Sequence, residues 1–154
     1  MSLSVAVRFG TRRPWVPPSR RLVEWARTAA GRRAGGQELA IRVVTPAESR
    51  RLNRDYRGKD RPTNVLSFQG PGIAAGDAPA ALGDLAICAG VVAREARAQQ
   101  KTLAAHWAHM VVHGTLHLMG YDHEDAAGAR RMERRERAVL ARLGFKNPYE
   151  SARD

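Results

Sequence analysis

The 154-residue sequence predicts an α+β fold, in which residues 1–154 form a single domain with a mixed sheet of about four strands and about five helices. Three observations support this prediction. Apolar runs typical of strands occur only in the first 88 residues. Segments with helical spacing of apolar residues lie between the early strands, and then follow one another towards the end of the chain. We therefore expect helices mainly on one face of the sheet.

The first half of the chain is expected to alternate strands and helices. Its predicted elements are a strand at 3–9, a helix at about 20–30, a strand at 39–43 and a helix at about 46–55. Both strands alternate apolar and other side chains, and prolines separate the first strand from the helix after it. Ser19 is the expected N-cap of the first helix, and Thr45 with Glu48 forms a capping box for the second.

The second half is expected to begin with two strands and to continue as helices. A short apolar run predicts a strand at 65–68, and the nearly continuous apolar run at 84–88 suits a central strand. Residues 70–83, rich in glycine, alanine and proline, are expected to form a mobile connection. Three helices should follow, at about 90–101, 103–120 and 125–143. The charged residues of the last helix are expected to form a solvated face without a site.

Composition and charge favour a nucleic-acid partner. Lysine and arginine total 26 against 15 acidic residues, which gives a formal charge of +11. Such an excess attracts polyanions, although an arginine-rich composition can also result from a coding bias. No signal peptide or membrane-spanning segment is recognisable, so a cytoplasmic protein without membrane contact is expected. The single cysteine, Cys88, lies in an apolar run and is expected to be a buried thiol in a reducing compartment.

The segment HGTLHLMGYDH at residues 113–123 predicts a metal site. His113 and His117 are one helical turn apart, so their side chains leave the same face of a helix. Gly120 can end that helix and turn the chain so that His123 approaches the pair. Three imidazoles with one open position form the ligand set of a catalytic zinc site. We therefore expect one Zn²⁺ ion, held by the three histidines and a water molecule.

Two further histidines precede this segment. His109 also stands one helical turn before His113, but three successive turns cannot all reach one ion, since they are about 5.4 Å apart. The turn at Gly120 favours the later pair, so His109 is expected to lie beside the ligands, to face the substrate or to pack in the core. His106 is expected at the start of the helix, with no part in the chemistry.

The histidine spacing also matches that of the metzincin peptidases, with one exception. Gly114 stands where those enzymes have the glutamate that acts as a base. Asp122 and Glu124, which flank the third histidine, remain candidates for orienting an imidazole or accepting a proton.

A second group of charged residues lies between the predicted second helix and third strand. Arg57, Lys59 and Arg61 belong to a predicted loop at 56–64, and an arginine can hold a phosphate through two parallel hydrogen bonds and stabilise charge that develops on it. The other interpretation is an exposed basic loop without a special task. Three aromatic residues near the motifs could stack on bases, although core positions are favoured for each: Tyr56, Phe68 and Tyr121.

Three segments together resemble the YbeY family of bacterial rRNA-maturation factors: YRGKDRPTNVLSF at 56–68, LGDLAIC at 82–88 and HGTLHLMGYDH at 113–123. The resemblance implies a zinc-dependent, single-strand-specific endoribonuclease that acts in 16S rRNA 3′-end maturation, ribosome quality control and 30S assembly. It also implies the 30S subunit and its associated proteins as partners. Matched by motif, the implied zinc ligands are His113, His117 and His123, and the arginine needed for activity is Arg57.

The expected reaction is hydrolysis of a phosphodiester in single-stranded RNA, with Arg57 and His113 as the catalytic residues. One alternative is a metallopeptidase or amidohydrolase, which the histidine spacing favours and Gly114 opposes. Another is a ribosome-assembly factor without catalytic activity that contains structural zinc, which the charge favours and the open three-histidine site opposes. The residues leave open whether water or the ribose 2′-hydroxyl attacks, and which group is the general base.

Overall fold

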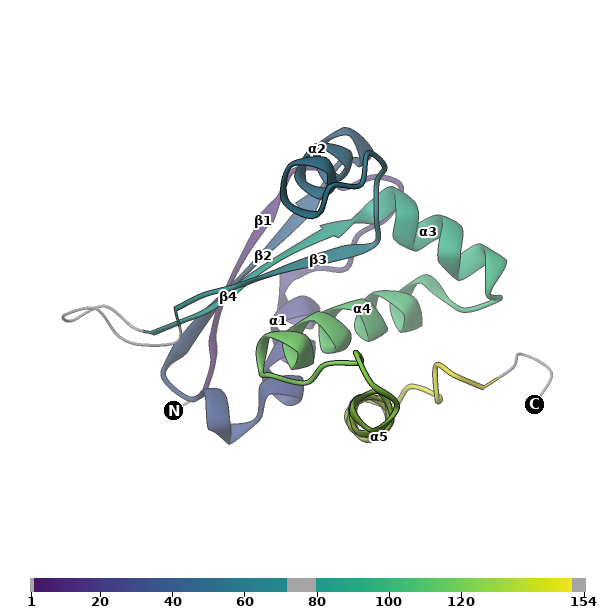
Figure 1. The fold of residues 1–154 in the computed structure, drawn as a ribbon. Coiled ribbons are helices and arrows are strands. Elements are labelled where there is room, and N and C mark those ends of the chain that lie inside the picture. Colours follow the sequence, from purple (N-terminus) through teal and green to yellow (C-terminus); the bar gives the residue numbers. More distant parts are fainter. Residues whose placement is uncertain (1, 72–79, 151–154) are drawn as a thin grey trace.

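The structure is a computed structural model that describes residues 2–71 and 80–150. Within these residues, four strands form one mixed sheet and five α-helices surround it, as the sequence predicts (Figure 1). The strands are β1 (Ser4–Phe9), β2 (Gln37–Val44), β3 (Val65–Gln69) and β4 (Ala80–Cys88). The helices are α1 (Ser19–Ala30), α2 (Pro46–Arg57), α3 (Ala89–Ala98), α4 (Leu103–Leu118) and α5 (Ala126–Arg142). A 3₁₀-helix also spans Arg32–Ala34.

The strand order is β1-β2-β4-β3, with β3 antiparallel to β4 and the other pairs parallel. The predicted central position of 84–88 is therefore confirmed. However, β4 begins at Ala80, so residues 80–83 are part of a strand and not of a connection; residues 72–79 lie outside the described residues. Gly83 interrupts the apolar pattern of this strand. It has a φ of +152°, and a Cβ there would lie 2.5 Å from the Phe68 carbonyl oxygen, so β3 and β4 can approach only because this residue is glycine.

The two faces of the sheet pack against different helices. Alternate residues of β2 and β4, such as Ile41 and Leu85, are buried with α1 and α4 in the main core, which also contains Trp25 and Trp107. Helices α1, α4 and α5 lie on this side of the sheet, whereas α2 covers the opposite face, where Cys88 is fully buried (Figure 1). Among the described residues, no helix is both long and apolar enough to cross a membrane.

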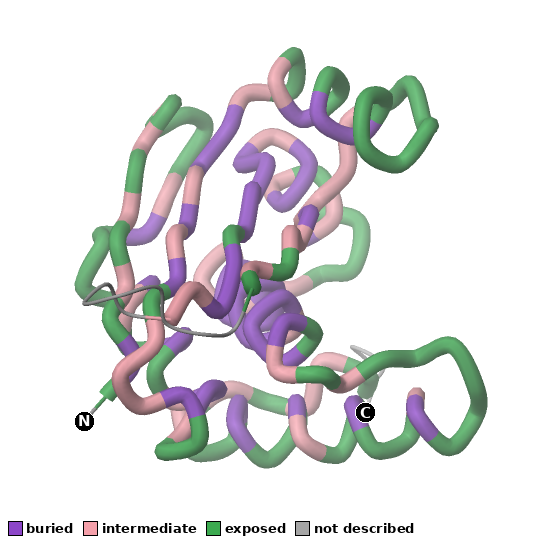
Figure 2. Tube along the Cα trace, turned by 60° about the vertical axis from the view of Figure 1, so that its left-hand side comes forward, coloured by how far each residue is buried: buried purple, intermediate pink, exposed green. Residues whose placement is uncertain are grey.

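Helix α4 is the most buried helix, and Figure 2 contrasts it with the largely exposed α5. The Thr102 side chain caps its first turn by accepting a hydrogen bond from the Ala105 amide, at 3.1 Å. Gly114 faces β4, and a Cβ there would lie 2.7 Å from a methyl carbon of Leu85. The absence of a side chain at Gly114 therefore lets α4 lie close to the sheet. Gly120, with a φ of +102°, follows the helix as predicted.

Two predicted helix boundaries are wrong. Ser19 is the first residue of α1 and not its N-cap, because Pro18 takes the N-cap position without a side-chain hydrogen bond. Helix α2 continues to Arg57, so Tyr56 and Arg57 are helical and the loop begins at Gly58. Gly58 ends the helix in the left-handed conformation, with its amide donating to the Arg54 carbonyl at 3.1 Å. This placement gives Arg57 a defined position at the end of a helix.

Candidate functional site

A cleft of about 420 Å³ lies between α4 and the segment that connects α2 to β3. It brings together the two groups of residues that the sequence singles out, the three histidines of the 113–123 segment and the three cations after Tyr56. Its lining residues are Asn53, Arg57, Lys59, Arg61, Thr63, Asn64, Val65, Leu66, Ser67, His113, Gly114, His117 and His123. Thus, among the described residues that line the cleft, three are cationic, three are histidines and none is a carboxylate.

The three imidazole rings meet at one side of this cleft. His123 lies edge-on to His113 with ring centroids 5.7 Å apart, and edge-on to His117 with centroids 6.4 Å apart. Burial lowers the pKa of His117, and the nearby His113, His123 and Arg57 lower it further. His117 is therefore neutral at neutral pH, which is the form that can bind a metal. The role of the three histidines as metal ligands stays a prediction.

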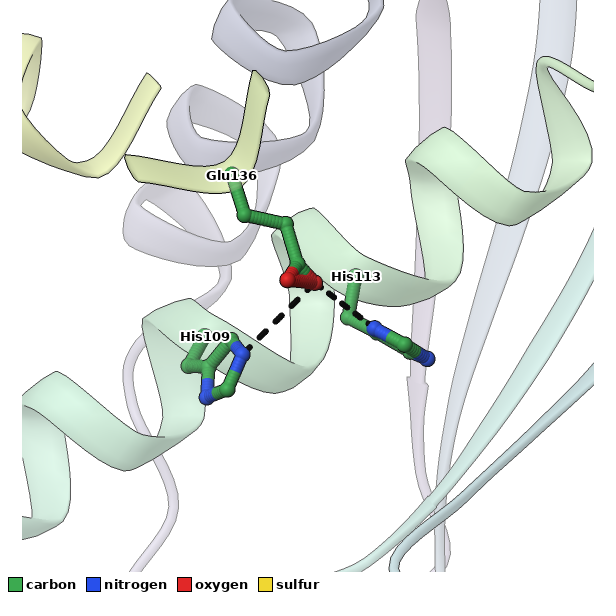
Figure 3. Close-up of side chains that lie close together, drawn as sticks. All are labelled: His109, His113 and Glu136. Carbon is green, nitrogen blue, oxygen red and sulfur yellow. Dashed lines mark hydrogen bonds and ion pairs between the residues drawn. The ribbon is translucent and has the colours of Figure 1, made fainter. Parts of the chain in front are cut away.

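A buried carboxylate from α5 contacts the other side of His113. Glu136 is 0% exposed, and its Oε2 accepts a hydrogen bond from His113 Nδ1 at 2.7 Å. The same oxygen lies 3.6 Å from His109 Nε2, and Tyr149 donates its hydroxyl hydrogen to Glu136 Oε1. Figure 3 shows that His113 turns Nδ1 towards Glu136 and its second ring nitrogen away from it. The prediction that the charged residues of α5 form a solvated face is therefore wrong at Glu136.

The charge of Glu136 is stabilised despite its burial. Burial alone would raise its pKa, but the contacts with His109, His113 and Tyr149 together lower it to about 2, so the carboxylate is ionised at neutral pH. Burial and the bond to Glu136 raise the pKa of Tyr149, which keeps its hydroxyl protonated as a donor. Glu136 thus has donors on both oxygens.

This group is also a possible metal site. One ligand atom from each of His109, His113 and Glu136 lies within 4.8 Å of the others, so the three could hold a metal ion. His109 is 8% exposed, and both its ring nitrogens are buried without a hydrogen-bond partner in the described part of the chain. Of the three places predicted for His109, beside the ligands, facing the substrate or packed in the core, its burial supports packing, and its relation to a metal ion stays a prediction.

Arg57 is held at the opposite wall of the cleft. Its Nη2 donates to the Ser67 carbonyl of β3 at 2.8 Å, and its Nη1 donates to the Tyr56 carbonyl at 3.3 Å. The loop after it is fixed from α2, since Arg50 forms two hydrogen bonds with Asp60, at 2.7 and 3.0 Å. The guanidinium group is therefore positioned in the cleft before any substrate binds.

The two walls of the cleft are connected by Glu95 of α3. Asn64, in the loop before β3, donates to both carboxylate oxygens of Glu95, at 3.0 and 3.2 Å. His106 Nε2 of α4 lies 2.9 Å from the same carboxylate. His106 is 2% exposed, and its pKa is lowered, mainly by burial, although Glu95 acts in the opposite direction. The expectation that His106 lies outside the chemistry stays a prediction.

The comparisons with known proteins identify the family of this chain. A family model described as "Endoribonuclease YbeY" matches residues 19–144, which include all six of the histidines and cations of the cleft. The chain belongs to the YbeY family. It is 55% identical over 137 residues to a protein of Halorhodospira halophila named "Endoribonuclease YbeY", covering 87% of this chain and 88% of that protein. It is 56% identical over 143 residues to the protein of that name from Alkalilimnicola ehrlichii, covering 89% and 84%.

A solved structure supports the fold of this YbeY-family chain. The solution structure of TM1509 from Thermotoga maritima matches it with a TM-score of 0.60, covering 96% of this chain and 97% of that one. The two sequences are 22% identical, so this likeness concerns the fold alone.

Other predicted residues of this YbeY-family chain lie outside the cleft lining. Asp122 and Glu124 are exposed, and Asp122 Oδ1 accepts a hydrogen bond from the Glu124 amide at 3.3 Å. Neither forms a described hydrogen bond with a histidine, and their roles stay predictions. Of the three aromatic candidates, Tyr56 is 64% exposed and not a core residue. Its ring lies edge-on to Phe68, with centroids 5.3 Å apart, at the end of α2 where Arg57 begins the cleft. Tyr121 is partly buried and packs against the main core.

Proposed function

We propose that this protein is a zinc-dependent endoribonuclease that cuts single-stranded RNA in the cleft between α4 and the α2–β3 segment. Membership of the YbeY family supports the endoribonuclease class, because the family and both relatives have that name. Arg57 and His113 are the proposed catalytic residues, and His113, His117 and His123 the proposed zinc ligands.

The composition of the cleft is the observation that carries this proposal. Three histidines face Arg57, Lys59 and Arg61, and no carboxylate is among the described lining residues. Such a wall attracts the phosphates of a nucleic acid and leaves a peptide substrate without a neighbouring acid–base group. Gly114 lines the cleft but has no side chain, and a Cβ there would lie 2.7 Å from a methyl carbon of Leu85, so the glutamate of the metzincin peptidases has no counterpart at this position. A metallopeptidase is therefore the weaker alternative.

The residues present fit a zinc ion. Three imidazoles at an accessible cleft are a donor set that zinc accepts, and the His113–Glu136 hydrogen bond leaves the Nε2 atom of His113 free for it. When bound, zinc would supply Lewis-acid activation of water and of the scissile phosphate. Arg57 holds that phosphate and offsets the charge that develops on its oxygens. Lys59 and Arg61 hold neighbouring phosphates by charge.

An exposed aromatic residue supports binding of single strands. Tyr56 precedes Arg57 and presents its ring to solvent, supported from the side by Phe68. An unpaired base can stack on such a ring, whereas bases in a duplex are already stacked on one another. The family resemblance extends the proposal to 16S rRNA 3′-end maturation, ribosome quality control and 30S assembly in the cytoplasm, with the 30S subunit and its proteins as partners.

One experiment distinguishes the candidate functions. Zinc-loaded protein and its His117→Ala and Arg57→Ala variants are offered single-stranded RNA, duplex RNA and an unfolded peptide. We expect the unmodified protein to cleave only the single-stranded RNA, and both variants to cleave it far more slowly. Cleavage of peptide that survives Arg57→Ala would instead indicate a metallopeptidase. RNA binding without cleavage, in preparations whose nuclease contamination has been excluded, would indicate an assembly factor that is not an enzyme.

A further inference from the structure

We propose that Glu136 is a positioning residue, which is held by Tyr149 and fixes His113 in the tautomer that presents Nε2 to the cleft. The inference rests on the proposed zinc site, but the state of the His113 ring can be measured without a metal. It assigns a role to the segment after α5, which contributes no residue to the cleft lining.

The tautomer follows from the chemistry of the two partners. A carboxylate only accepts hydrogen bonds, so the 2.7 Å contact requires His113 Nδ1 to carry the hydrogen. In the neutral ring, Nε2 then holds the lone pair that a metal needs. An unrestrained imidazole would exchange between two tautomers and rotate about its side-chain bonds. Glu136 removes both freedoms before the ion arrives, which favours binding.

Glu136 is itself held in place. It belongs to the apolar face of α5 and lies beside Met132, Val139 and Leu140, each about 1% exposed, so it cannot turn to solvent. The Tyr149 hydroxyl occupies its second oxygen. The Tyr149 ring lies edge-on to His109, with centroids 5.5 Å apart, so the segment after α5 is packed against α4 at the turn before His113. Tyr149 thereby keeps the second oxygen of Glu136 satisfied, and Oε2 remains directed at His113.

The alternative is that Glu136 binds the ion directly with His109 and His113. Two ligands of a tetrahedral zinc ion, each at about 2.0–2.1 Å, are separated by roughly 3.4 Å. The 2.7 Å between His113 Nδ1 and Glu136 Oε2 is shorter and matches a hydrogen bond between an N–H group and a carboxylate. Glu136 is also fully buried, whereas the Nε2 side of His113 opens on the cleft. The geometry therefore favours positioning over ligation.

The test combines NMR of the metal-free protein with zinc affinity. Long-range ¹H–¹⁵N spectra report which nitrogen of His113 carries the hydrogen, and competition with a chromogenic chelator gives the zinc affinity. The variants are Glu136→Gln, Glu136→Leu and Tyr149→Phe. Glu133→Gln is the matched control, because Glu133 is an exposed glutamate one turn earlier on the same helix. Thermal unfolding of each variant shows that it is folded at the temperature of the measurements.

We expect Nδ1–H at His113 in the unmodified protein, in the Glu133→Gln control and in Glu136→Gln, whose amide oxygen still accepts. Glu136→Leu should give mixed tautomers and bind zinc about 10- to 100-fold more weakly. Tyr149→Phe should retain the tautomer and weaken zinc binding by less than Glu136→Leu. Since the unmodified protein and Glu136→Gln already decide the matter, a Glu136→Leu protein that fails to fold leaves the proposal testable.

Three results would overturn the proposal. The first is an Nε2–H tautomer of His113 in the unmodified protein, and the second is unchanged zinc affinity in folded Glu136→Leu. The third is loss of zinc binding in Glu136→Gln with the tautomer retained, which would make Glu136 a ligand. Failure of the proposed function is distinguishable, because it would appear as unchanged zinc affinity in His117→Ala, whatever the tautomer of His113.

Discussion

Replacing Arg57 with alanine should change the stability of the fold little and the rate of RNA cleavage strongly. The side chain is exposed, and it forms two hydrogen bonds to the carbonyl groups of Ser67 and Tyr56. When the arginine is removed, water can hydrogen-bond both carbonyls, so we expect a loss of at most about 1 kcal/mol in the free energy of unfolding. For a chain of this size, that corresponds to a decrease of roughly 2–4 °C in the melting temperature.

The expected loss of activity is much larger. A positioned donor that stabilises developing charge contributes about 10²- to 10³-fold to the rate, or about 2.7–4 kcal/mol. We therefore expect Arg57→Ala to cut a labelled single-stranded RNA about 10²- to 10³-fold more slowly under saturating conditions. The cleavage rate of Arg57→Lys should fall between those of the unmodified protein and Arg57→Ala, because lysine keeps the charge without the planar pair of donors.

Arg54→Ala is the matched control for this experiment. Arg54 lies on the same helix, is exposed, and pairs with Asp55 at 3.1 Å away from the cleft lining. Arg54→Ala removes the same unit of charge as Arg57→Ala but outside the cleft lining. We therefore expect its cleavage rate to be close to that of the unmodified protein. An Arg57→Ala rate within about tenfold of the unmodified protein, or an equal loss in Arg54→Ala, would refute the assignment of Arg57.

Three further changes test other parts of the structure. Gly83→Ala should destabilise the fold by about 1–3 kcal/mol or more, because of its positive φ and the close Phe68 carbonyl, and an unchanged urea midpoint would contradict this. Tyr56→Ala should weaken binding of single-stranded RNA by about 1–3 kcal/mol and leave the melting temperature nearly unchanged; equal binding by both proteins would exclude stacking there. The metal-free protein should lose stability as the pH falls below about 6.5, because the unfolded chain then binds a proton that buried His106 resists. His106→Gln should reduce this dependence of the free energy of unfolding on pH. The reduction should be partial, because burial also lowers the pKa of His117. Chemical unfolding at neutral and mildly acidic pH measures the dependence.

The strands, the helices and the cleft residues were largely predictable because each depends on short-range patterns. Helical spacing places His113 and His117 on one face, and Gly120 supplies the turn that brings His123 to them. The capping box at Thr45 is also local, and its side chain accepts from the Glu48 amide at 3.2 Å. These features need no knowledge of the tertiary structure.

Two of the errors concern residues whose environment comes from distant parts of the chain. Glu136 stands among many charged residues of α5, and its burial depends on α4 and on the segment that contains Tyr149. One local signal was present, since Glu136 falls at helical spacing between the apolar Met132 and Leu140. Gly83 is a similar case, because a glycine in a low-complexity segment does not indicate a strand until its neighbour β3 is known.

The contacts of Glu95 affect the spacing between the two walls of the cleft. Arg57 extends from α2 to β3, whereas His113 and His117 lie on α4 and His123 in the loop after it, so the reactive gap lies between two walls. One carboxylate spans these walls by holding Asn64 on one side and His106 on the other. Glu95 is not among the described lining residues, so a side chain outside the cleft helps to fix its width, and with it the thickness of strand that can enter, together with the direct packing of α4 on the sheet at Gly114.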